Sequence, residues 1–477
     1  MIKKKKLIDV VAKKIGNIED VLSVSFVGSF LTKKNFSDID IVVITKKISK
    51  KIIEKCHKEI KEINFKTLGT GKEILINDTF GPLKFNTKKN LVFHLMIYSY
   101  EDHVKHVINS PFTCYDWERT KASYGLNLKD LYPVLKIFSS DLFMKNRGLS
   151  AYRKNLKSGT INYQKYIFKK KKVITKKLNY KIIGKDIAEF CYHVINFSVK
   201  NYLKYRQQKN KDFKLTEINN FIKKISNSKK SNEMLMLFKY LTSFKKNNKI
   251  LTNKKKLIDK TLNFLDLLEA HIKAEKKNSI NLQFKRHFKT KYNKKIFLGQ
   301  KINPPILKNK YFFKKNYEVA FTSPSIRSIQ TSKLFSKEQK IIKNLNEIDY
   351  GDAEGLSYNK FKKKYPNLIN SWLNKQDVRF PNGENTKDVS KRVIKFINFI
   401  KKSDLSEKKY LIVTHNVFLR CLLGKYFQIP IYKWFLLNID YGENINFKLL
   451  NNKFFINITR HKFKKIFKKV YENSIST

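Results

Sequence analysis

Residues 281–293, NLQFKRHFKTKYN, decide how the C-terminal part of the chain is interpreted. NLQFKR is a candidate strand, and it ends on Arg286 with His287 next in the chain. An arginine and a histidine at the end of an apolar run can form a phosphate-handling pair. They can also be two more basic residues in a basic chain, so the surroundings must decide between the two interpretations.

Two further strand candidates of this region also end on polar residues. VAFT (319–322) runs into SPSIRSIQT, where Ser323 suits a helix N-cap and Arg327 falls in the first helical turn. YLIVT (410–414) is followed by His415. Strands separated by helical stretches predict a doubly wound α/β/α sheet, and ligands bind at the carboxyl ends of its strands. Two arginines and two histidines would meet there, and forked guanidinium and imidazole N–H donors suit a phosphate dianion.

Five segments of this region resemble, in chain order, the motifs of the histidine phosphatase (phosphoglycerate mutase-like) superfamily. One segment alone is a weak signal, whereas five in order are a strong one. They are RHFKTKYNKKIFLGQKINPPI (286–306), TSPSIRSIQTSKLF (322–335), LNEIDYGDAEGLS (345–357), FPNGENTKDVSKRV (380–393) and VTHNVFLR (413–420).

The resemblance implies a catalytic role for each matching position. His287 would be the nucleophile that forms a phosphohistidine, which water then hydrolyses. Arg286, Arg327 and His415 would bind the phosphoryl oxygens, and Glu347 would protonate the leaving oxygen. The resemblance implies no metal and no other cofactor for this domain, because the arginines neutralise the phosphate.

The chain departs from the family's motifs at three positions that follow His287 or His415 in the chain. Phe288 stands where the family has a glycine, Lys289 where it usually has a glutamate, and Asn416 where it usually has a glycine. A phenylalanine at 288 either re-aims the pocket or fills it. A filled pocket would favour a decayed domain that binds phosphate without turning it over.

The N-terminal region contains a second candidate site in FVGSFLTKKNFSDIDIVVI (26–44). Asp38 and Asp40 lie two apart on a predicted strand, so both carboxylates face the same side and can hold one divalent ion. Gly28 allows a tight turn, and Ser29 with the N–H groups after it can cradle a triphosphate.

This pattern resembles the polymerase-β-type nucleotidyltransferase superfamily, and the resemblance implies an α/β domain that uses Mg²⁺ and a nucleoside triphosphate. Asp38 and Asp40 would bind the metal, and Gly28 and Ser29 the nucleotide phosphates. The family also has a third carboxylate on a later strand, where LVFHLMIY (91–98) has His94 instead. Asp78 and Glu73 are the fallback candidates for it.

At 477 residues the chain is long enough for about three domains. The predicted division is a nucleotidyltransferase-like domain (1–135), an all-α domain (136–277), a histidine phosphatase domain (278–465) and a tail (466–477). Amphipathic helices at 185–205 and 256–276 define the middle region, which has no motif of its own.

Composition indicates which ligands the protein attracts and which cellular compartment suits it. The 101 Lys and Arg against 39 Asp and Glu give a net charge of +62, which attracts nucleic acids and phosphorylated substrates. The lysines are spread along the whole chain, as an AT-rich coding bias would produce. The four scattered cysteines and the lack of a long apolar run predict a cytoplasmic protein with no membrane span. The sequence leaves the oligomeric state open.

The sequence supports three functions. The first is a bifunctional enzyme, a nucleotidyltransferase fused to a phosphatase acting on small phosphorylated metabolites. The second is an RNA-end-processing enzyme whose binding would depend steeply on salt. The third is a non-catalytic phosphate-binding scaffold.

Overall fold

The computed structural model describes residues 3–32, 36, 38–77, 79–80, 90–169, 172–184, 186–247, 253–292, 295–307 and 313–472. The chain divides into two compact units, Met1–Ile272 and Lys273–Thr477. Both units combine sheets with helices. The predicted boundary at 135 lies inside the first unit, and the three-domain division stays a prediction. Within the described residues, no helix combines the length and the apolar character that crossing a bilayer requires.

The first unit begins with a mixed five-stranded sheet in the order β3-β5-β2-β1-β6. β2 runs parallel to β5 and antiparallel to β1. The predicted strand that carries Asp38 and Asp40 is β2, and the predicted strand at 91–98 lies within β5. Their inward side chains are mostly buried Val, Ile and Phe. The strands are β1 (Val21–Val27), β2 (Asp38–Thr45), β3 (Glu73–Asn77), β5 (Asn90–Ser99) and β6 (Tyr124–Gly125).

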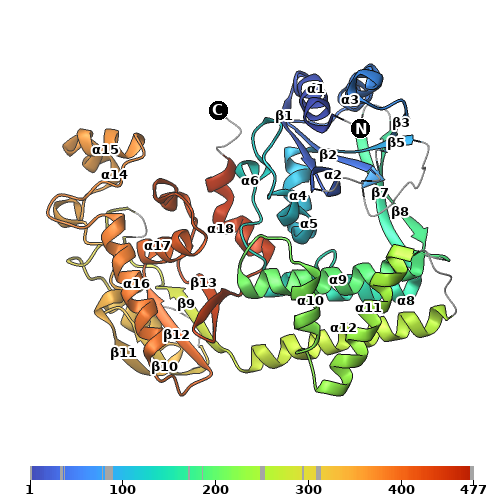
Figure 1. The fold of residues 1–477 in the computed structure, drawn as a ribbon. Coiled ribbons are helices and arrows are strands. Elements are labelled where there is room, and N and C mark those ends of the chain that lie inside the picture. Colours follow the sequence, from blue (N-terminus) through green and yellow to red (C-terminus); the bar gives the residue numbers. More distant parts are fainter. Residues whose placement is uncertain are drawn as a thin grey trace. The chain divides into compact units, whose positions relative to one another are not determined.

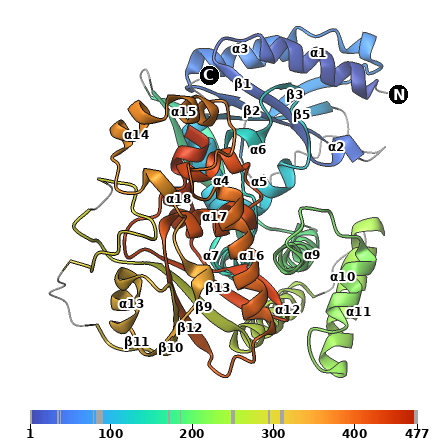
Figure 2. The same ribbon diagram turned by 90° about the vertical axis from the view of Figure 1, so that its left-hand side faces the viewer.

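Helices cover both faces of this sheet. α1 and α3 pack together on one side, and α4 and α5 lie on the other (Figures 1 and 2). Ser49 caps α3 by accepting a hydrogen bond from the Ile52 amide at 3.3 Å. The elements are α1 (Lys4–Gly16), the short α2 (Ser29–Thr32), α3 (Lys50–Lys61), α4 (Tyr100–Asn109) and α5 (Pro111–Trp117).

The rest of the first unit is not all-α, so that part of the prediction is wrong. A long antiparallel hairpin, β7 (Thr160–Lys169) and β8 (Lys172–Lys181), pairs with the short strand β4 (Thr79–Phe80) (Figure 1). Lysines interrupt the apolar residues of both strands, which hides their alternation. The helices are α6 (Leu128–Leu131), α7 (Ser139–Met144), α8 (Leu149–Ser158), α9 (Asp186–Gln207), α10 (Leu215–Ile222), α11 (Ser228–Asn247) and α12 (Lys254–Lys277).

The second unit is built on a six-stranded sheet in the order β11-β10-β12-β9-β13-β14. The first four strands in this order are parallel to one another, as predicted. β13 runs antiparallel to both of its neighbours, β9 and β14. The strands are β9 (Ile280–Arg286), β10 (Tyr317–Thr322), β11 (Ser336–Ile341), β12 (Lys409–Thr414), β13 (Asn444–Leu450) and β14 (Lys453–Ile456).

Helices flank the second sheet, with α13 on one side and α16 and α17 on the other (Figure 2). α16 begins at an Asn385 capping box, and Val389, Val393, Phe396 and Ile400 form its buried stripe. The predicted tail at 466 is wrong up to Glu472, because α18 continues through it with buried apolar residues. The helices are α13 (Ile326–Lys333), α14 (Tyr358–Lys364), α15 (Pro366–Leu373), α16 (Thr386–Lys402), α17 (Asn416–Tyr426) and α18 (Arg460–Glu472).

Candidate active site

The pairing of β9 with β12 places two histidines side by side. The strands are parallel, with Thr414 opposite Arg286, so His287 and His415 leave the sheet at the same edge. The His287 amide donates to the Thr414 carbonyl at 3.0 Å. The imidazole ring centres are 5.1 Å apart. Two residues far apart in sequence therefore meet as the sequence pattern predicts.

β10 brings a third group to this edge. The Ser323 amide donates to the Val413 carbonyl at 3.1 Å, and α13 follows with Arg327 in its first turn. The helix begins two residues later than predicted, since its N-cap is Ser325 rather than Ser323. This shift leaves the Ser323 hydroxyl available for contact with His415.

His287 is held in the tautomer that a nucleophile needs. Its Nδ1 lies 2.6 Å from the carbonyl oxygen of Phe288. A carbonyl can only accept a hydrogen bond, so Nδ1 carries the hydrogen and Nε2 keeps its lone pair. Burial, with the charges of Arg327 and Arg286, holds the pKa of His287 well below its ordinary value, against the opposing effect of the Phe288 carbonyl. The imidazole is therefore neutral at physiological pH.

Two buried arginines flank the histidines. Arg286 donates through Nη1 to the Ile439 carbonyl at 2.6 Å, and its guanidinium lies 3.7 Å from the ring centre of Tyr441. Arg327 donates through Nη2 to the Gly299 carbonyl at 2.7 Å. Burial lowers the pKa of both groups, but a guanidinium keeps its proton in proteins. Both contribute full positive charges to the site.

His415 is oriented by hydroxyl groups. Its Nε2 lies 2.8 Å from Ser323 Oγ and 3.3 Å from the Oγ atoms of both Ser325 and Ser328. A serine hydroxyl that donates to Nε2 leaves the hydrogen on Nδ1. Burial and the charge of Arg327 keep the pKa of His415 well below its ordinary value. The sequence motif identified His415 but not its serine partners, whose role depends on the start of α13.

The site holds unused hydrogen-bonding capacity. Among the described residues, Arg286 Nε, Arg327 Nε and His415 Nδ1 are buried and have no protein partner. Buried polar groups without partners are costly, so such atoms commonly mark a place for a ligand or an ordered water. Three N–H donors beside the free Nε2 of His287 fit the oxygens of a phosphoryl group.

Glu347 stands at the N-terminus of α17. Its carboxylate accepts from the amides of Ile348 and Asn416, both at 3.1 Å, and from that of Val417 at 3.0 Å. Burial raises the pKa of Glu347 above its ordinary value, although the amides and the charges of Arg327 and Arg286 oppose this effect. A carboxyl group with a raised pKa is suited to giving and taking a proton.

A half-buried ion pair supports the loop that carries Glu347. Arg392 of α16 binds Glu384 through two parallel contacts, Nε–Oε1 at 3.0 Å and Nη2–Oε2 at 2.7 Å. Its Nη2 also donates to the Glu347 carbonyl at 3.1 Å. This pair was not predicted as functional, although both residues lie in the 380–393 motif. Its bidentate geometry fixes the loop, so it positions Glu347.

Phe288 does not direct its ring at His287. The ring stacks on Phe313 at 5.7 Å between centres and packs against Phe335 at 5.9 Å. It also lies against Gly442, while its backbone carbonyl makes the contact with His287. Phe288, which replaces the family's glycine, thus directs its ring toward Phe313 and Phe335. The alternative in which this ring fills the phosphate pocket is not supported.

The N-terminal residues form a different arrangement from the predicted metal site. Asp40 of β2 lies opposite His94 of β5, with Oδ1 3.0 Å from Nδ1. His94 Nε2 lies 2.5 Å from the Thr79 carbonyl. Burial would lower the pKa of His94, but the hydrogen bond and charge of Asp40 outweigh it and raise that pKa. Because both ring nitrogens of His94 are engaged, one by Asp40 and one by the Thr79 carbonyl, neither has a free lone pair with which to act as a base.

Glu73, one of the two fallback carboxylates, does not complete a metal site. Glu73 lies opposite Asn90, four residues along the strand from the level of His94, or roughly 13 Å at 3.3 Å per residue. Asp78 lies outside the described residues. Within the part of the chain that the structure describes, no three His, Cys, Asp or Glu side chains are grouped to hold a metal ion. Asp40 does not offer Mg²⁺ a free Oδ1, because His94 Nδ1 contacts that oxygen.

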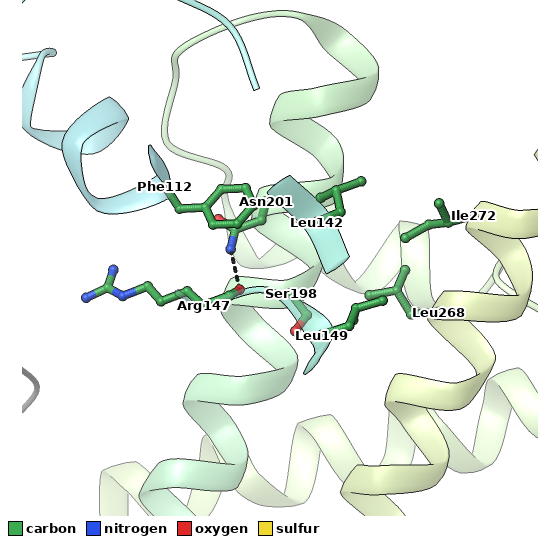
Figure 3. Close-up of a pocket in the computed structure, with 8 residues that line it drawn as sticks. All are labelled: Phe112, Leu142, Arg147, Leu149, Ser198, Asn201, Leu268 and Ile272. Atoms are coloured by element: carbon green, nitrogen blue, oxygen red, sulfur yellow. Dashed lines mark hydrogen bonds between the residues drawn. The ribbon is translucent and has the colours of Figure 1, made fainter. Parts of the chain in front are cut away.

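The helical part of the first unit contains one small cavity that carries no charged group aimed into it. Figure 3 shows Phe112, Leu142, Leu149, Leu268 and Ile272 around it, with the Arg147 guanidinium pointing away. Asn201 donates to the Arg147 carbonyl at 3.1 Å. The lining is typical of a packed core with room for a water molecule.

Comparison with known proteins bears on the second unit. The family model of the histidine phosphatase superfamily (branch 1) matches residues 307–458. A 2,3-bisphosphoglycerate-dependent phosphoglycerate mutase of Parvibaculum lavamentivorans is 30% identical over 142 residues, covering 28% of this chain and 68% of the mutase. Through its C-terminal unit, the chain belongs to the histidine phosphatase superfamily.

Other similarities are more partial. The corresponding mutase of Methylobacterium radiotolerans is 31% identical over 116 residues, and the match spans 22% of this chain and 55% of that mutase. The chain thus covers about half the length of this relative. A solved structure described as a putative alpha-ribazole-5'-P phosphatase from Escherichia coli is 20% identical, with a TM-score of 0.33, over 38% of this chain and 96% of that one. The family model begins after His287, so the nucleophile is assigned by its position in the site.

Proposed function

We propose that the C-terminal unit hydrolyses a phosphomonoester through a phosphohistidine on Nε2 of His287. The observation that carries this proposal is the set of three buried N–H donors without protein partners, on Arg286, Arg327 and His415. The residues that carry these donors lie near an imidazole whose tautomer leaves Nε2 free to attack. Preorganised donors of this kind stabilise the charge that develops on a transferring phosphoryl group.

The reaction has two displacements. In the first, the Nε2 lone pair of His287 forms a bond to phosphorus while the ester P–O bond breaks, and Glu347 gives its proton to the leaving oxygen. In the second, water attacks phosphorus, its proton returns to the Glu347 carboxylate, and the N–P bond breaks to release inorganic phosphate. Splitting one difficult step into two in this way is the advantage of a covalent intermediate.

Small phosphorylated metabolites are the proposed substrate class. Curated relatives carry the name phosphoglycerate mutase, in which a phosphoryl group changes position on a three-carbon acid. A mutase would pass the phosphoryl group from His287 to a second hydroxyl, whereas a phosphatase passes it to water. Both need the same histidine and the same donors, so the products must distinguish them.

The test is phosphate release from a panel of phosphomonoesters in excess EDTA. The panel includes phosphoglycerates, sugar phosphates and RNA oligonucleotides with terminal phosphates. We expect release by the wild type and a loss of at least about 10³-fold in kcat for His287→Ala, since the nucleophile is removed. Lys291→Ala is the matched control, because this exposed lysine lies in the same loop.

Each outcome of this experiment has a distinct meaning. Activity that persists in EDTA and disappears in His287→Ala supports the phosphohistidine route. Isomerised phosphoglycerate without net phosphate release would replace the phosphatase proposal by the mutase one. Wild-type activity that survives in His287→Ala would overturn the assignment of the nucleophile.

Nucleotidyl transfer by the N-terminal unit is not included in this proposal. The resemblance that predicts it requires a divalent ion on Asp38 and Asp40, and the contact between Asp40 and His94 occupies that place. The RNA-processing alternative stays a prediction, and the oligonucleotides in the panel test it.

A further inference from the structure

A hydrogen bond joins Asp40 and His94, and the Asp40 oxygen that takes part in it cannot at the same time bind a metal ion. His94 is buried, and its Nε2 lies 2.5 Å from the Thr79 carbonyl oxygen, which can only accept. Nε2 therefore carries a hydrogen. The 3.0 Å contact between Nδ1 and Asp40 Oδ1 then needs a second hydrogen, whether it is bonded to nitrogen or to oxygen. In either arrangement, Oδ1 faces a proton rather than a vacant coordination position.

The second oxygen of Asp40 is also confined. Gly28 has a φ of +78°, and a Cβ at that position would lie 2.3 Å from Asp40 Oδ2. The carboxylate thus packs directly on the turn, which only a residue without a side chain permits. A hard divalent ion takes several oxygen ligands in a regular shell. Asp40 has one oxygen bonded to His94, and the other packs against Gly28.

The position of His94 explains why the sequence pattern alone is misleading. β2 and β5 are parallel with Asp40 directly opposite His94, so the imidazole fills the space beside the carboxylate on the same face. The side chain also links β5 to residue 79 through the Thr79 carbonyl. A cation placed beside Asp40 Oδ1 would meet the hydrogen that lies between that oxygen and His94 Nδ1.

We propose that His94 takes the place of a divalent ion in the N-terminal unit. The Asp40–His94–Thr79 chain closes the site by hydrogen bonds alone, and the wild-type unit binds neither Mg²⁺ nor Mn²⁺ there. Replacing His94 by aspartate removes the imidazole with its hydrogens and adds a third carboxylate. This single change creates a cation site that the wild type lacks.

The test is Mn²⁺ binding to the full chain, measured from the loss of the free-ion electron paramagnetic resonance signal. Four proteins are compared: the wild type, Asp40→Asn, His94→Asp and the double variant Asp40→Asn/His94→Asp. We expect the wild type and Asp40→Asn to bind Mn²⁺ equally weakly. We expect His94→Asp to gain one site at least ten-fold tighter, which the double variant loses.

Two results would overturn the proposal. A wild-type Mn²⁺ site that Asp40→Asn removes would show that the predicted metal site exists. A folded His94→Asp protein that gains no binding would show that His94 is not what excludes the ion. Circular dichroism establishes folding, and if His94→Asp is unfolded, the comparison of the wild type with Asp40→Asn decides. Neither measurement depends on the phosphatase activity.

Discussion

Replacing Gly442 by alanine should destabilise the C-terminal unit through a clash with Phe288. Gly442 has a φ of +73°, and its Cβ would lie 2.7 Å from Phe288 Cε1 and 2.9 Å from Cδ1. The Phe288 ring cannot easily retreat, because Phe313 and Phe335 pack against it. The Gly442 amide also donates to the Arg286 carbonyl at 3.1 Å, so displacement would reach the active site.

The expected cost has two parts. An alanine in the left-handed region costs about 1–2 kcal/mol, and overpacking a filled site costs about 1–3 kcal/mol. Gly442→Ala should therefore lower the free energy of unfolding by about 2–5 kcal/mol. Phe288→Ala alone should lower it by about 3–5 kcal/mol through the cavity it leaves. In the double variant the clash is absent, so the two losses should fall short of additivity by about 1–3 kcal/mol.

Urea unfolding followed by tryptophan fluorescence measures these energies. The chain has three tryptophans, and a Trp117→Phe background leaves Trp372 and Trp434, both in the second unit, as the reporters. Additive losses within about 0.5 kcal/mol would refute the reasoning, because they would show that Gly442 and Phe288 do not constrain each other.

Two pH experiments test the charges near the same loop. Burial lowers the pKa of Lys285 from 10.5 to about 8, so the unfolded chain holds this proton more tightly and stability should rise with pH between about 8 and 10.5. The Lys285→Met variant should lack this pH-dependent rise in stability, which amounts to up to about 3 kcal/mol at 1.4 kcal/mol per pKa unit. If the urea midpoints of the two proteins instead change in parallel with pH, the lowered pKa of Lys285 is contradicted. The pH profile of kcat/KM reports His287, which must be neutral to attack and whose pKa is lowered. The value of kcat/KM should stay constant as pH falls through 6.5 and decline only at lower pH. A decline centred on pH 6.5 would instead indicate an imidazole exposed to water.

The C-terminal site was largely predictable from sequence because its parts lie at strand ends. Arg286, His287 and His415 follow apolar runs directly, and parallel pairing must bring such ends to one edge. The start of α13 was not predictable to the residue, since Ser323 and Ser325 are both good caps. Tertiary contacts settled that choice, and with it which serine binds His415.

Other features depend on contacts that no local pattern records. The β7–β8 hairpin was missed because lysines dilute its alternation, and a strand that is exposed on both faces gives little periodic signal. The contact that argues against the predicted metal site is of the same kind. The spacing of Asp38 and Asp40 shows which face they share, but only the pairing of β2 with β5 shows that His94 lies against Asp40.

The contact between Phe288 and Gly442 has a consequence for how this domain has changed over time. Bulk at position 288 is compatible with the fold only while position 442 has no side chain. The two positions, distant in sequence, are therefore subject to one shared constraint. Among relatives, a large residue at 288 should occur with glycine at 442, and position 442 can acquire a side chain only after residue 288 has become small.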